Sequence, residues 1–533
     1  MSSRPAATLR GTVHAPAAAA ARPLGRRGGL WLVVYLTLML LGATCVTGTA
    51  ALAVDAASAA SALALVLIAI SSLWISGGAA SALIGVLQPK AAAFAVPATW
   101  RPRHGTAILM LLCGEAAEPV ASYLAGLRRR IDAIGLEQST TIFVLSDTQG
   151  EARIAAEEAA LAELIASGTV VYRRRSENSG RKPGNIADWL ENHGADFGYM
   201  LVLDADSRMT SGRIRALIHR MEHDPRLGLL QAGIAMVPGR SLFGRHQRLA
   251  SRLLSNNFGR GLAAWSGDAG NYWGHNAIMR VGAFRSAATL PVLSGRAPFG
   301  GPPLSHDFIE AAWIRRAGWT VALDPDMRGS AEDGPQTLTE FHRRDRRWCQ
   351  GNLQHLRLIG EAGIDPVSRL HLASGVLGYL VAPIWMTLVL LFATGFVVID
   401  SAAALLLIAL ILLLPKFCAI AAWQRRARTP VRRRLLYRAA VNELLLSTLI
   451  APLIMLRQSA AVIAVFMGRD CGWKSSGGRR FERSLQWLEP LLGIALLALA
   501  LASGSVASAA WLLPVTLPLI LAPRLQRWLA GGA

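Results

Sequence analysis

The sequence predicts an α/β domain inserted between transmembrane α-helices. Long apolar stretches stand on either side of a less apolar central region in this chain of 533 residues, of which 53% are hydrophobic and only 17% charged. That balance is typical of a membrane protein rather than a soluble one. From about residue 100 to 365, short apolar runs alternate with helical patterns. Strands and helices alternating at this spacing predict a mostly parallel, doubly wound sheet.

The chain before this domain is predicted to form a transmembrane hairpin over 30–90. Residues 1–29 are rich in Ala, Pro and Arg and predict a disordered, cytoplasmic N-terminus. The stretches 30–52 and 61–87 are each long enough to cross a bilayer. The first is longer than the apolar core of a signal peptide. Basic residues on both outer flanks of the hairpin place its two ends in the cytoplasm.

After the domain, two transmembrane pairs are predicted over 370–423 and 487–523, with 524–533 as a cytoplasmic C-terminus. The region 424–486 between them is expected to be cytoplasmic or interfacial. Within it, 440–467 carries Glu443, Pro452 and Arg457. This part fits either an interfacial helix followed by a re-entrant piece or a weakly marked hairpin. Basic flanks at both ends of the bundle require an even number of crossings, which gives six or eight spans.

The formal charge of +21 is distributed mainly beside the apolar spans. This distribution is typical of cytoplasmic loops that face anionic lipid, and no nucleic-acid motif accompanies it. We therefore expect a lipid bilayer as partner and no nucleic acid. The five cysteines are far apart and show no zinc or disulfide spacing.

The central motif is Asp204-Ala205-Asp206, directly after an apolar run. Strands are predicted at 107–112, 141–145, 169–172, 199–203 and 228–231, with helices at 120–134 and 151–166. Because alternate side chains of a strand share a face, the two carboxylates can converge on one small volume. Two carboxylates there repel each other unless a cation lies between them. The pattern indicates a metal–diphosphate site, whereas a lone pair of acids at a turn is the simpler alternative.

Other polar residues are predicted at the same edge of the sheet. Glu115 and Asp147 follow the first two strands, and ligands of such sheets bind beyond the carboxyl ends of the strands. Lys182 and Asn185 stand at the start of a predicted helix, where a cation and backbone amides suit phosphate. The run 173–175 (Arg-Arg-Arg) is interpreted as a charged surface rather than a donor-steering element.

Three later motifs complete the set. Trp273, His275 and Asn276 form an aromatic and polar turn that suits a sugar, although a buried Trp is equally common. Asp307 opens a helix, either as a general base or as a helix cap. Arg344 and Arg347 share one helix face beside Trp348; such a group can bind a diphosphate and a sugar, or simply anchor a helix at the membrane surface.

The order and wording of these motifs resemble the inverting family 2 glycosyltransferases. Within that group, the chain resembles the glucans biosynthesis glucosyltransferase H family, through Tyr172–Arg175, Val202–Ser207, Tyr272–Ala277, Ser305–Phe308, Arg315–Trp319 and Arg344–Cys349. This likeness extends strongly over about residues 100–400. The resemblance implies a GT-A type domain that polymerises glucose from UDP-glucose into the β-1,2-linked backbone of osmoregulated periplasmic glucans.

Carried to this sequence, the family pattern implies a role for each motif. Glu115, Asp147, Lys182, Asn185, Asp204, Arg344 and Arg347 would contact the nucleotide sugar. Asp206 would bind Mg²⁺ or Mn²⁺, Asp307 would be the catalytic base, and the acceptor glucan would contact Trp273, His275, Asn276 and Trp348. One departure stands out, because this chain has Gly114 where the family usually has Asn before the glutamate.

The resemblance also implies a place in the cell. The protein is expected in the bacterial inner membrane with its catalytic domain in the cytoplasm, exporting the glucan toward a periplasmic glucan-modifying protein. A transferase acting on a lipid carrier, another processive synthase of the cellulose type, and a non-enzymatic membrane scaffold remain alternatives.

Overall fold

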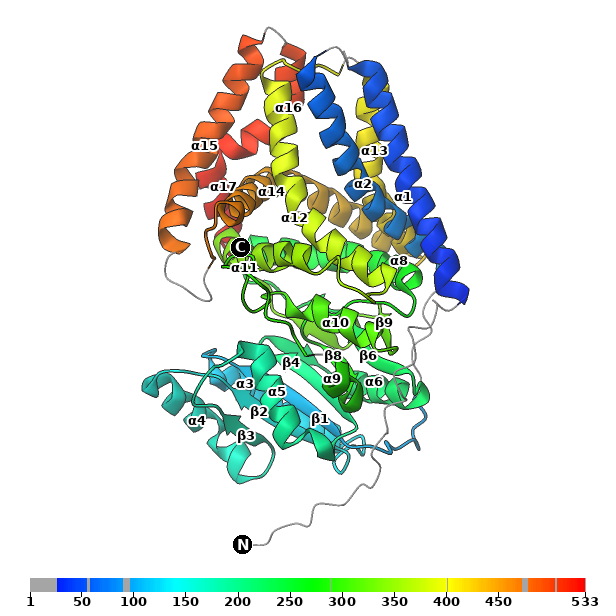
Figure 1. Cartoon of the computed structure of the whole chain (residues 1–533), viewed down its shortest axis with the longest axis vertical. Helices are drawn as coiled ribbons and strands as arrows, with labels where there is room; N and C mark the ends of the chain where they lie inside the picture. Colours follow the sequence, from blue (N-terminus) through cyan, green and yellow to red (C-terminus); the bar gives the residue numbers. More distant parts are fainter. Residues whose placement is uncertain are drawn as a thin grey trace.

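The protein consists of an α/β domain beneath a bundle of long helices (Figure 1). The computed structural model describes residues 26–54, 58–89, 96–287, 289–399, 401–471, 478–503 and 506–532. Most of the predicted disordered N-terminus, residues 1–25, lies outside these ranges. Three layers of the α/β domain, a sheet with helices on both faces, position the candidate site.

A seven-stranded sheet forms the middle layer, in the order β3-β2-β1-β4-β8-β6-β9. All neighbouring pairs are parallel except those of β8, which runs antiparallel to both β4 and β6. The five predicted strands are all present, with ends that differ from prediction by one or two residues. The bounds are β1 Thr106–Leu112, β2 Thr140–Ser146, β3 Val171–Arg174, β4 Tyr199–Asp204, β6 Leu227–Ala232, β8 Ala277–Arg280 and β9 Thr320–Asp324.

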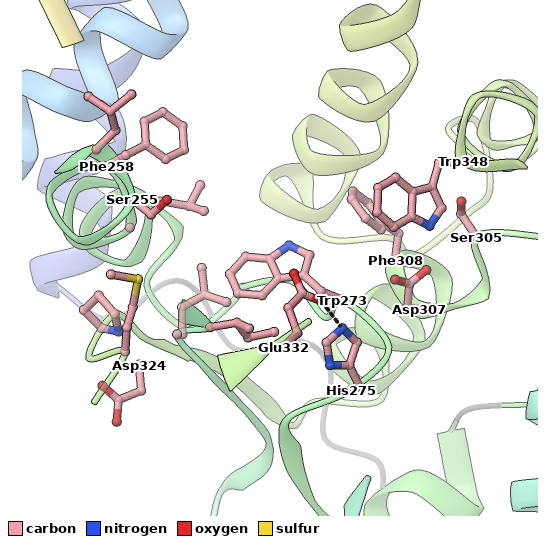
Figure 2. A pocket seen from close by; sticks show the side chains of 18 of the residues that line it. Ser255, Phe258, Trp273, His275, Ser305, Asp307, Phe308, Asp324, Glu332 and Trp348 are labelled. Atoms are coloured by element: carbon pink, nitrogen blue, oxygen red, sulfur yellow. Dashed lines mark ion pairs between the residues drawn. The ribbon is translucent and has the colours of Figure 1, made fainter. Parts of the chain in front are cut away.

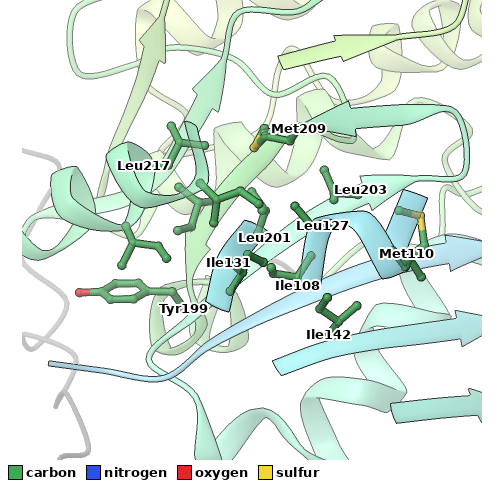
Figure 3. Close-up of a cluster of buried hydrophobic side chains, with 14 of the residues drawn as sticks. Ile108, Met110, Leu127, Ile131, Ile142, Tyr199, Leu201, Leu203, Met209 and Leu217 are labelled. Atoms are coloured by element: carbon green, nitrogen blue, oxygen red, sulfur yellow. The ribbon is translucent and has the colours of Figure 1, made fainter. Parts of the chain in front are cut away.

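The central strands are apolar along their whole length because both faces of the sheet are covered. In β1, every residue is buried. Ile108, Met110 and Leu112 point into one core (Figure 3), whereas Ala107 and Leu109 point into the core on the opposite face. The alternation of side chains along one strand thus divides a single apolar run between two cores.

Three helices pack on each face. The core of Figure 3 is completed by α3 (Ala117–Asp132), α4 (Glu151–Ala166) and α6 (Ser211–His223). The other core is completed by α5 (Arg181–Asn192), α9 (Val281–Ala287) and α10 (His306–Arg316). The helices predicted at 120–134 and 151–166 correspond to α3 and α4. This arrangement confirms the expected α/β domain.

A small second sheet lies beside the end of β4. Its order is β5-β10-β7, with bounds Ser207–Met209, Ser330–Glu332 and Ala235–Met236. In the antiparallel pairing of β10 with β5, Glu332 lies opposite Ser207. A residue 125 positions later is therefore brought next to the Asp204–Asp206 motif, a contact that no local pattern predicts.

Five helices of the described part are long and apolar enough to cross a membrane. They are α1 (Arg26–Ala53), α2 (Ala59–Leu87), α12 (Pro366–Ala393), α13 (Ala402–Gln424) and α14 (Pro430–Phe466). A pair bent by 62°, within α16 (Val506–Ile520) and α17 (Ala522–Ala530), would make six, and α15 (Gly478–Ala502) contains a shorter apolar segment. By length and composition the described residues thus give five or six spans, against the predicted six or eight.

The region predicted as a helix plus re-entrant piece, or as a hairpin, is instead one continuous helix. α14 runs through 37 residues with Pro452 in its interior. Proline is tolerated inside such a helix when neighbouring helices surround it, and Pro452 and Leu453 are buried. Figure 1 shows α14 lying across the lower ends of the other helices rather than beside them.

Several helices of the α/β domain contact this bundle, among them α8 and α11. Asn257 and Trp265 of α8 (Asn256–Ser266) donate hydrogen bonds to the Ala82 carbonyl (2.8 Å) and the Ser81 hydroxyl (3.1 Å) of α2. On α11 (Leu338–Gln354), the Asp345 carboxylate accepts hydrogen bonds from α12 and α14. The remaining short helices are α7 (Leu242–Ala250), a π-helical turn (Ser251–Ser255), and 3-10 turns at Gly194–Asp196 and His355–Arg357.

Candidate active site

A cleft of about 370 Å³ lies beyond the carboxyl ends of β1, β2 and β4. We call it the strand-end cleft. Every predicted site residue except Asn276 lines it, although these residues come from segments up to 233 positions apart. They are Glu115, Asp147, Lys182, Asn185, Asp204, Asp206, Trp273, His275, Asp307, Arg344, Arg347 and Trp348. The topology of the sheet therefore gathers motifs that are individually ambiguous.

Asp147 at the end of β2 is held by Arg175. The two side chains form a bidentate pair, with Nε–Oδ1 and Nη2–Oδ2 distances of 2.8 and 2.7 Å. Arg173 likewise pairs with Asp188 at 2.7 Å. Only Arg174 of this run is exposed, so the interpretation of the run as a charged surface is wrong for the other two. A bidentate guanidinium fixes the carboxylate plane, which orients Asp147 in the cleft.

Lys182, from the first turn of α5, contacts the carboxylate of Asp204. Burial alone would raise the pKa of Asp204, but Lys182, His275 and Arg344 together lower it below its ordinary value. The backbone amide of Asp204 also donates to the Ser207 hydroxyl at 3.1 Å. Asp204 is therefore held ionised at the tip of β4, with a cation beside it.

Asp206 has the opposite electrostatic environment. Burial raises its pKa, and the neighbouring Asp204 carboxylate raises it further, against the opposing effects of His275 and Arg344. A carboxylate whose charge is disfavoured in this way gains from binding a cation. The two acids thus differ in electrostatic environment, because Lys182 contacts Asp204, whereas the Asp204 carboxylate disfavours the charge of Asp206.

Asp307 lies in the first turn of α10, at the mouth of the cleft. Ser305 occupies the cap position of α10 without a side-chain capping bond. The two predicted roles of Asp307, general base and helix cap, stay predictions. Burial raises the pKa of Asp307, with a smaller lowering by His306. A Cβ at Gly274 would lie 3.6 Å from Oδ2 of Asp307 and 3.7 Å from Nζ of Lys182, so the acid and the cation flank one small volume.

Helix α11 forms the remaining wall. The Arg344 guanidinium lies 4.4 Å from the ring centre of Trp348, one turn further along, and donates to Glu332 at 3.3 Å. Glycine is required at Gly351, because an added Cβ would lie 2.4 Å from the Ser305 hydroxyl. This close approach brings α11 directly against the segment that carries Asp307.

Comparison with known proteins agrees with this geometry. Residues 199–423 match the family model described as glycosyl transferase family group 2. "Glucans biosynthesis glucosyltransferase H" of Vibrio cholerae is 40% identical over 456 residues, covering 79% of this chain and 62% of that protein. The protein of the same name from Shewanella sp. strain W3-18-1 is 36% identical over 508 residues, covering 87% of this chain and 69% of its own.

The chain belongs to the glucans biosynthesis glucosyltransferase H family. It spans about 62% of the length of the Vibrio cholerae relative. A solved mannosyltransferase, PcManGT from Pyrobaculum calidifontis in complex with GDP-Man and Mn²⁺, is 16% identical over 72% of this chain and 99% of that chain, with a TM-score of 0.44. That similarity is too low to bear on the site.

The acidic pair fits a divalent cation that is shared with a nucleotide. No three metal-ligating side chains meet at one point among the described residues. Mg²⁺ in nucleotide sites usually takes only one or two carboxylates and completes its shell with phosphate oxygens and water. Asp206, whose ionised form is disfavoured, suits the place of such a carboxylate ligand. Asp204 lies beside it and is paired with Lys182.

The departure at Gly114 has a conformational explanation. Gly114 has φ +82°, and its amide donates to Thr148 at 2.8 Å. Asn is among the side chains that tolerate a left-handed backbone best, so Gly and the family Asn suit the same turn. Glu115 follows this turn and lines the cleft.

Asn276 is the one predicted residue outside the cleft lining. It is buried, and its side-chain amide donates to the Ser330 hydroxyl at 3.0 Å and the Ala331 carbonyl at 3.2 Å. These bonds attach β10 to the domain. The predicted acceptor contact of Asn276 is therefore corrected to a structural role, because its donors are already used.

Sequence reasoning missed several residues of the site. Glu332 pairs with His275 at 3.2 Å as well as with Arg344. Asn178 lines the cleft, and its amide oxygen is buried without a hydrogen-bond partner among the described residues. Both residues lie in loops or short strands without a recognisable motif, so only the three-dimensional arrangement identifies them.

A second cavity of about 620 Å³ extends from this site toward the bundle. We call it the bundle-side cavity. It shares Trp273, His275, Ser305, Asp307, Arg344 and Trp348 with the strand-end cleft and continues to α2, α8, α12 and α13, where Ala82, Phe258, Tyr379 and Pro415 line it. Figure 2 shows the carboxylate of Asp307 near Trp348, with Trp273, Glu332 and His275 grouped beside them. The two cavities thus meet at Asp307.

Proposed function

We propose that this protein is an inverting membrane glucosyltransferase that transfers glucose from UDP-glucose to a growing β-glucan. The family membership supports the reaction class, because the relatives are named as glucosyltransferases of glucan synthesis. The observation that carries the proposal is the meeting of two cavities at Asp307. One cavity has the residues for a nucleotide diphosphate, and the other has the aromatic residues for a sugar chain.

In this proposal the donor occupies the strand-end cleft. Glu115, Asp147 and Asn185 contact the nucleoside, with Asp147 oriented by Arg175. Lys182, Arg344 and Arg347 lie where a diphosphate needs cations. Mg²⁺ bound at Asp206 would neutralise the charge that develops on the leaving diphosphate.

Asp307 accepts the proton of the acceptor hydroxyl as that oxygen attacks the anomeric carbon. Its raised pKa makes it a stronger base than an exposed aspartate. Direct displacement by one acceptor oxygen inverts the anomeric centre, so an α-linked donor gives a β-linked product. General base catalysis of this kind contributes about 10²–10⁴-fold to the rate.

The acceptor and the product occupy the bundle-side cavity. Trp273 and Trp348 are the aromatic faces on which a sugar ring stacks. From there the cavity reaches α13 at Pro415, which suits a chain that leaves through the helices toward the periplasm. The basic flanks of the spans support a catalytic domain in the cytoplasm, and the location in the inner membrane rests on the family resemblance alone. The β-1,2 linkage rests on the family resemblance alone.

Substitution of Asp307 by Asn tests the assignment of the base. Purified Asp307→Asn protein should bind UDP with Mg²⁺ as the wild type does, yet release almost no UDP from UDP-glucose. Near-normal turnover would refute the assigned role. Linkage analysis of glucan made in membrane vesicles from labelled UDP-glucose then tests the product, and a linkage other than β-1,2 would correct that part alone.

A lipid-linked acceptor is the second candidate, because the bundle-side cavity is lined mainly by apolar residues such as Leu254, Phe258 and Leu262. The two candidates differ in where the labelled sugar is found. A lipid-linked product partitions into organic solvent, whereas a free glucan stays in water.

A further inference from the structure

The turn after α13 and the first half of α14 form a strongly basic segment. No acidic residue occurs between positions 425 and 442, and Glu443 beyond them is buried and paired with Lys416. The basic residues of this segment are Arg425, Arg426, Arg428, Arg432, Arg433, Arg434 and Arg438. Such a segment needs an anionic partner, and nothing in its own sequence supplies one.

The segment lies at the level where the membrane helices end. α13 ends at Gln424, and Arg425 donates to the Val86 carbonyl near the end of α2 at 3.4 Å. Arg426 lies 5.3 Å from the ring centre of Trp423, and Trp is enriched at membrane–water interfaces. Figure 1 shows α14 crossing the helix ends at this level, on the side of the α/β domain.

One face of α14 combines arginines with exposed apolar residues. Val431, Arg434, Arg438, Val441 and Leu445 follow one another at intervals of three or four, so they form a stripe along the helix. All five side chains are exposed, with the three apolar ones between 55% and 69% exposed. Exposed apolar residues with arginines among them suit contact with a membrane surface, where arginines extend their charge to the headgroups.

We propose that this stripe docks on the membrane surface and binds anionic phospholipid headgroups through Arg434 and Arg438. Neither guanidinium has a hydrogen-bond or ion-pair partner among the residues that the structure describes. Guanidinium groups bind phosphate oxygens in a bidentate manner. In this arrangement the exposed apolar residues of the stripe reach the acyl boundary, and α13 beside them is long and apolar enough to cross the bilayer. This inference does not depend on the catalytic function.

The test measures thermal unfolding of the purified full chain in mild detergent while phosphatidylglycerol or phosphatidylcholine is added. Phosphatidylglycerol should raise the unfolding temperature more than phosphatidylcholine does, and high salt should reduce this difference. Each arginine near an anionic surface contributes roughly fivefold to affinity. The Arg434→Gln/Arg438→Gln variant should therefore need about 30-fold more phosphatidylglycerol for the half-maximal effect.

Two variants serve as controls. Arg129→Gln/Arg130→Gln removes the same charge from the exposed face of α3, far from the bundle, and should respond as the wild type does. Arg434→Lys/Arg438→Lys keeps the charge and should retain most of the response, which guards against a folding defect in the Gln variant. Equal effects of the two lipids, an unchanged response of the Gln variant, or the same shift with inorganic phosphate would each overturn the proposal.

Discussion

Replacing Asp345 by Asn should stabilise the protein at neutral pH. Asp345 is buried at the junction of α11, α12 and α14, where it accepts hydrogen bonds from the Tyr379 hydroxyl at 3.0 Å and the Gln458 amide at 3.1 Å. Burial raises its pKa from 3.8 to about 6, although both hydrogen bonds act in the opposite direction. Its charged form is therefore costly in the folded protein.

The pH dependence follows from the sign of this shift. Because the Asp345 carboxyl binds its proton more tightly in the folded protein than in the unfolded chain, its charge costs no stability below pH 3.8, and this cost grows as the pH rises toward about 6. At neutral pH the cost is about 3 kcal/mol. Asn is neutral and similar in shape but loses one acceptor, which costs about 1 kcal/mol. We expect a net gain of about 2 kcal/mol, from these two terms.

The assay is thermal unfolding of detergent-purified protein at one scan rate, at neutral pH and at about pH 4, on the low side of the shifted range. Asp345→Asn should unfold a few degrees above the wild type at neutral pH and lose this advantage at the lower pH. Asp196→Asn, on the exposed end of a surface turn, removes the same charge and should change little. An equal gain at both pH values, or none at neutral pH, would refute the reasoning.

Two further predictions concern the cleft. Gly351→Ala forces a methyl group against Ser305 and should displace the segment that carries Asp307, so turnover should fall more than UDP affinity. Gly360→Ala is the control: nothing lies within 4 Å of its Cβ position, so both turnover and UDP affinity should stay unchanged. Arg175→Gln frees Asp147 from its bidentate pair and should weaken UDP binding by about tenfold (roughly 1–2 kcal/mol for a charge-assisted bond) in calorimetric titration. Arg174→Gln is its exposed control, and equal losses in both variants would remove the assigned role of Arg175.

The sequence predicted those elements whose signal is local. The strands β1, β2 and β4 are apolar runs of six or seven residues, and their ends carry the acids that define the cleft. The sheet order could be anticipated only in outline. β8 enters antiparallel between β4 and β6, and its four residues have no feature that distinguishes such an insertion.

Contacts between distant residues were not predictable. Arg175 and Arg174 are chemically identical in the sequence, and only the pairing of β2 with β3 brings the former to Asp147. Glu332 lies in a three-residue strand and meets His275 through the small sheet. Asn276 belongs to a motif whose neighbours line the cleft, but its φ of +51° turns it toward β10.

Helix α11 explains why this site and the membrane bundle form one unit. Arg344 and Trp348 face both cavities, Gly351 rests on the segment of Asp307, and Asp345 is held by α12 and α14. A movement of α11 would therefore shift Arg344, Trp348 and the segment of Asp307 together, and with them the proposed diphosphate contacts, acceptor stack and base. Because Tyr379 and Gln458 belong to the bundle, the α/β domain alone would leave Asp345 without these partners. In the proposed mechanism the bundle would thus act on the chemistry through α11 as well as supplying a path for the product.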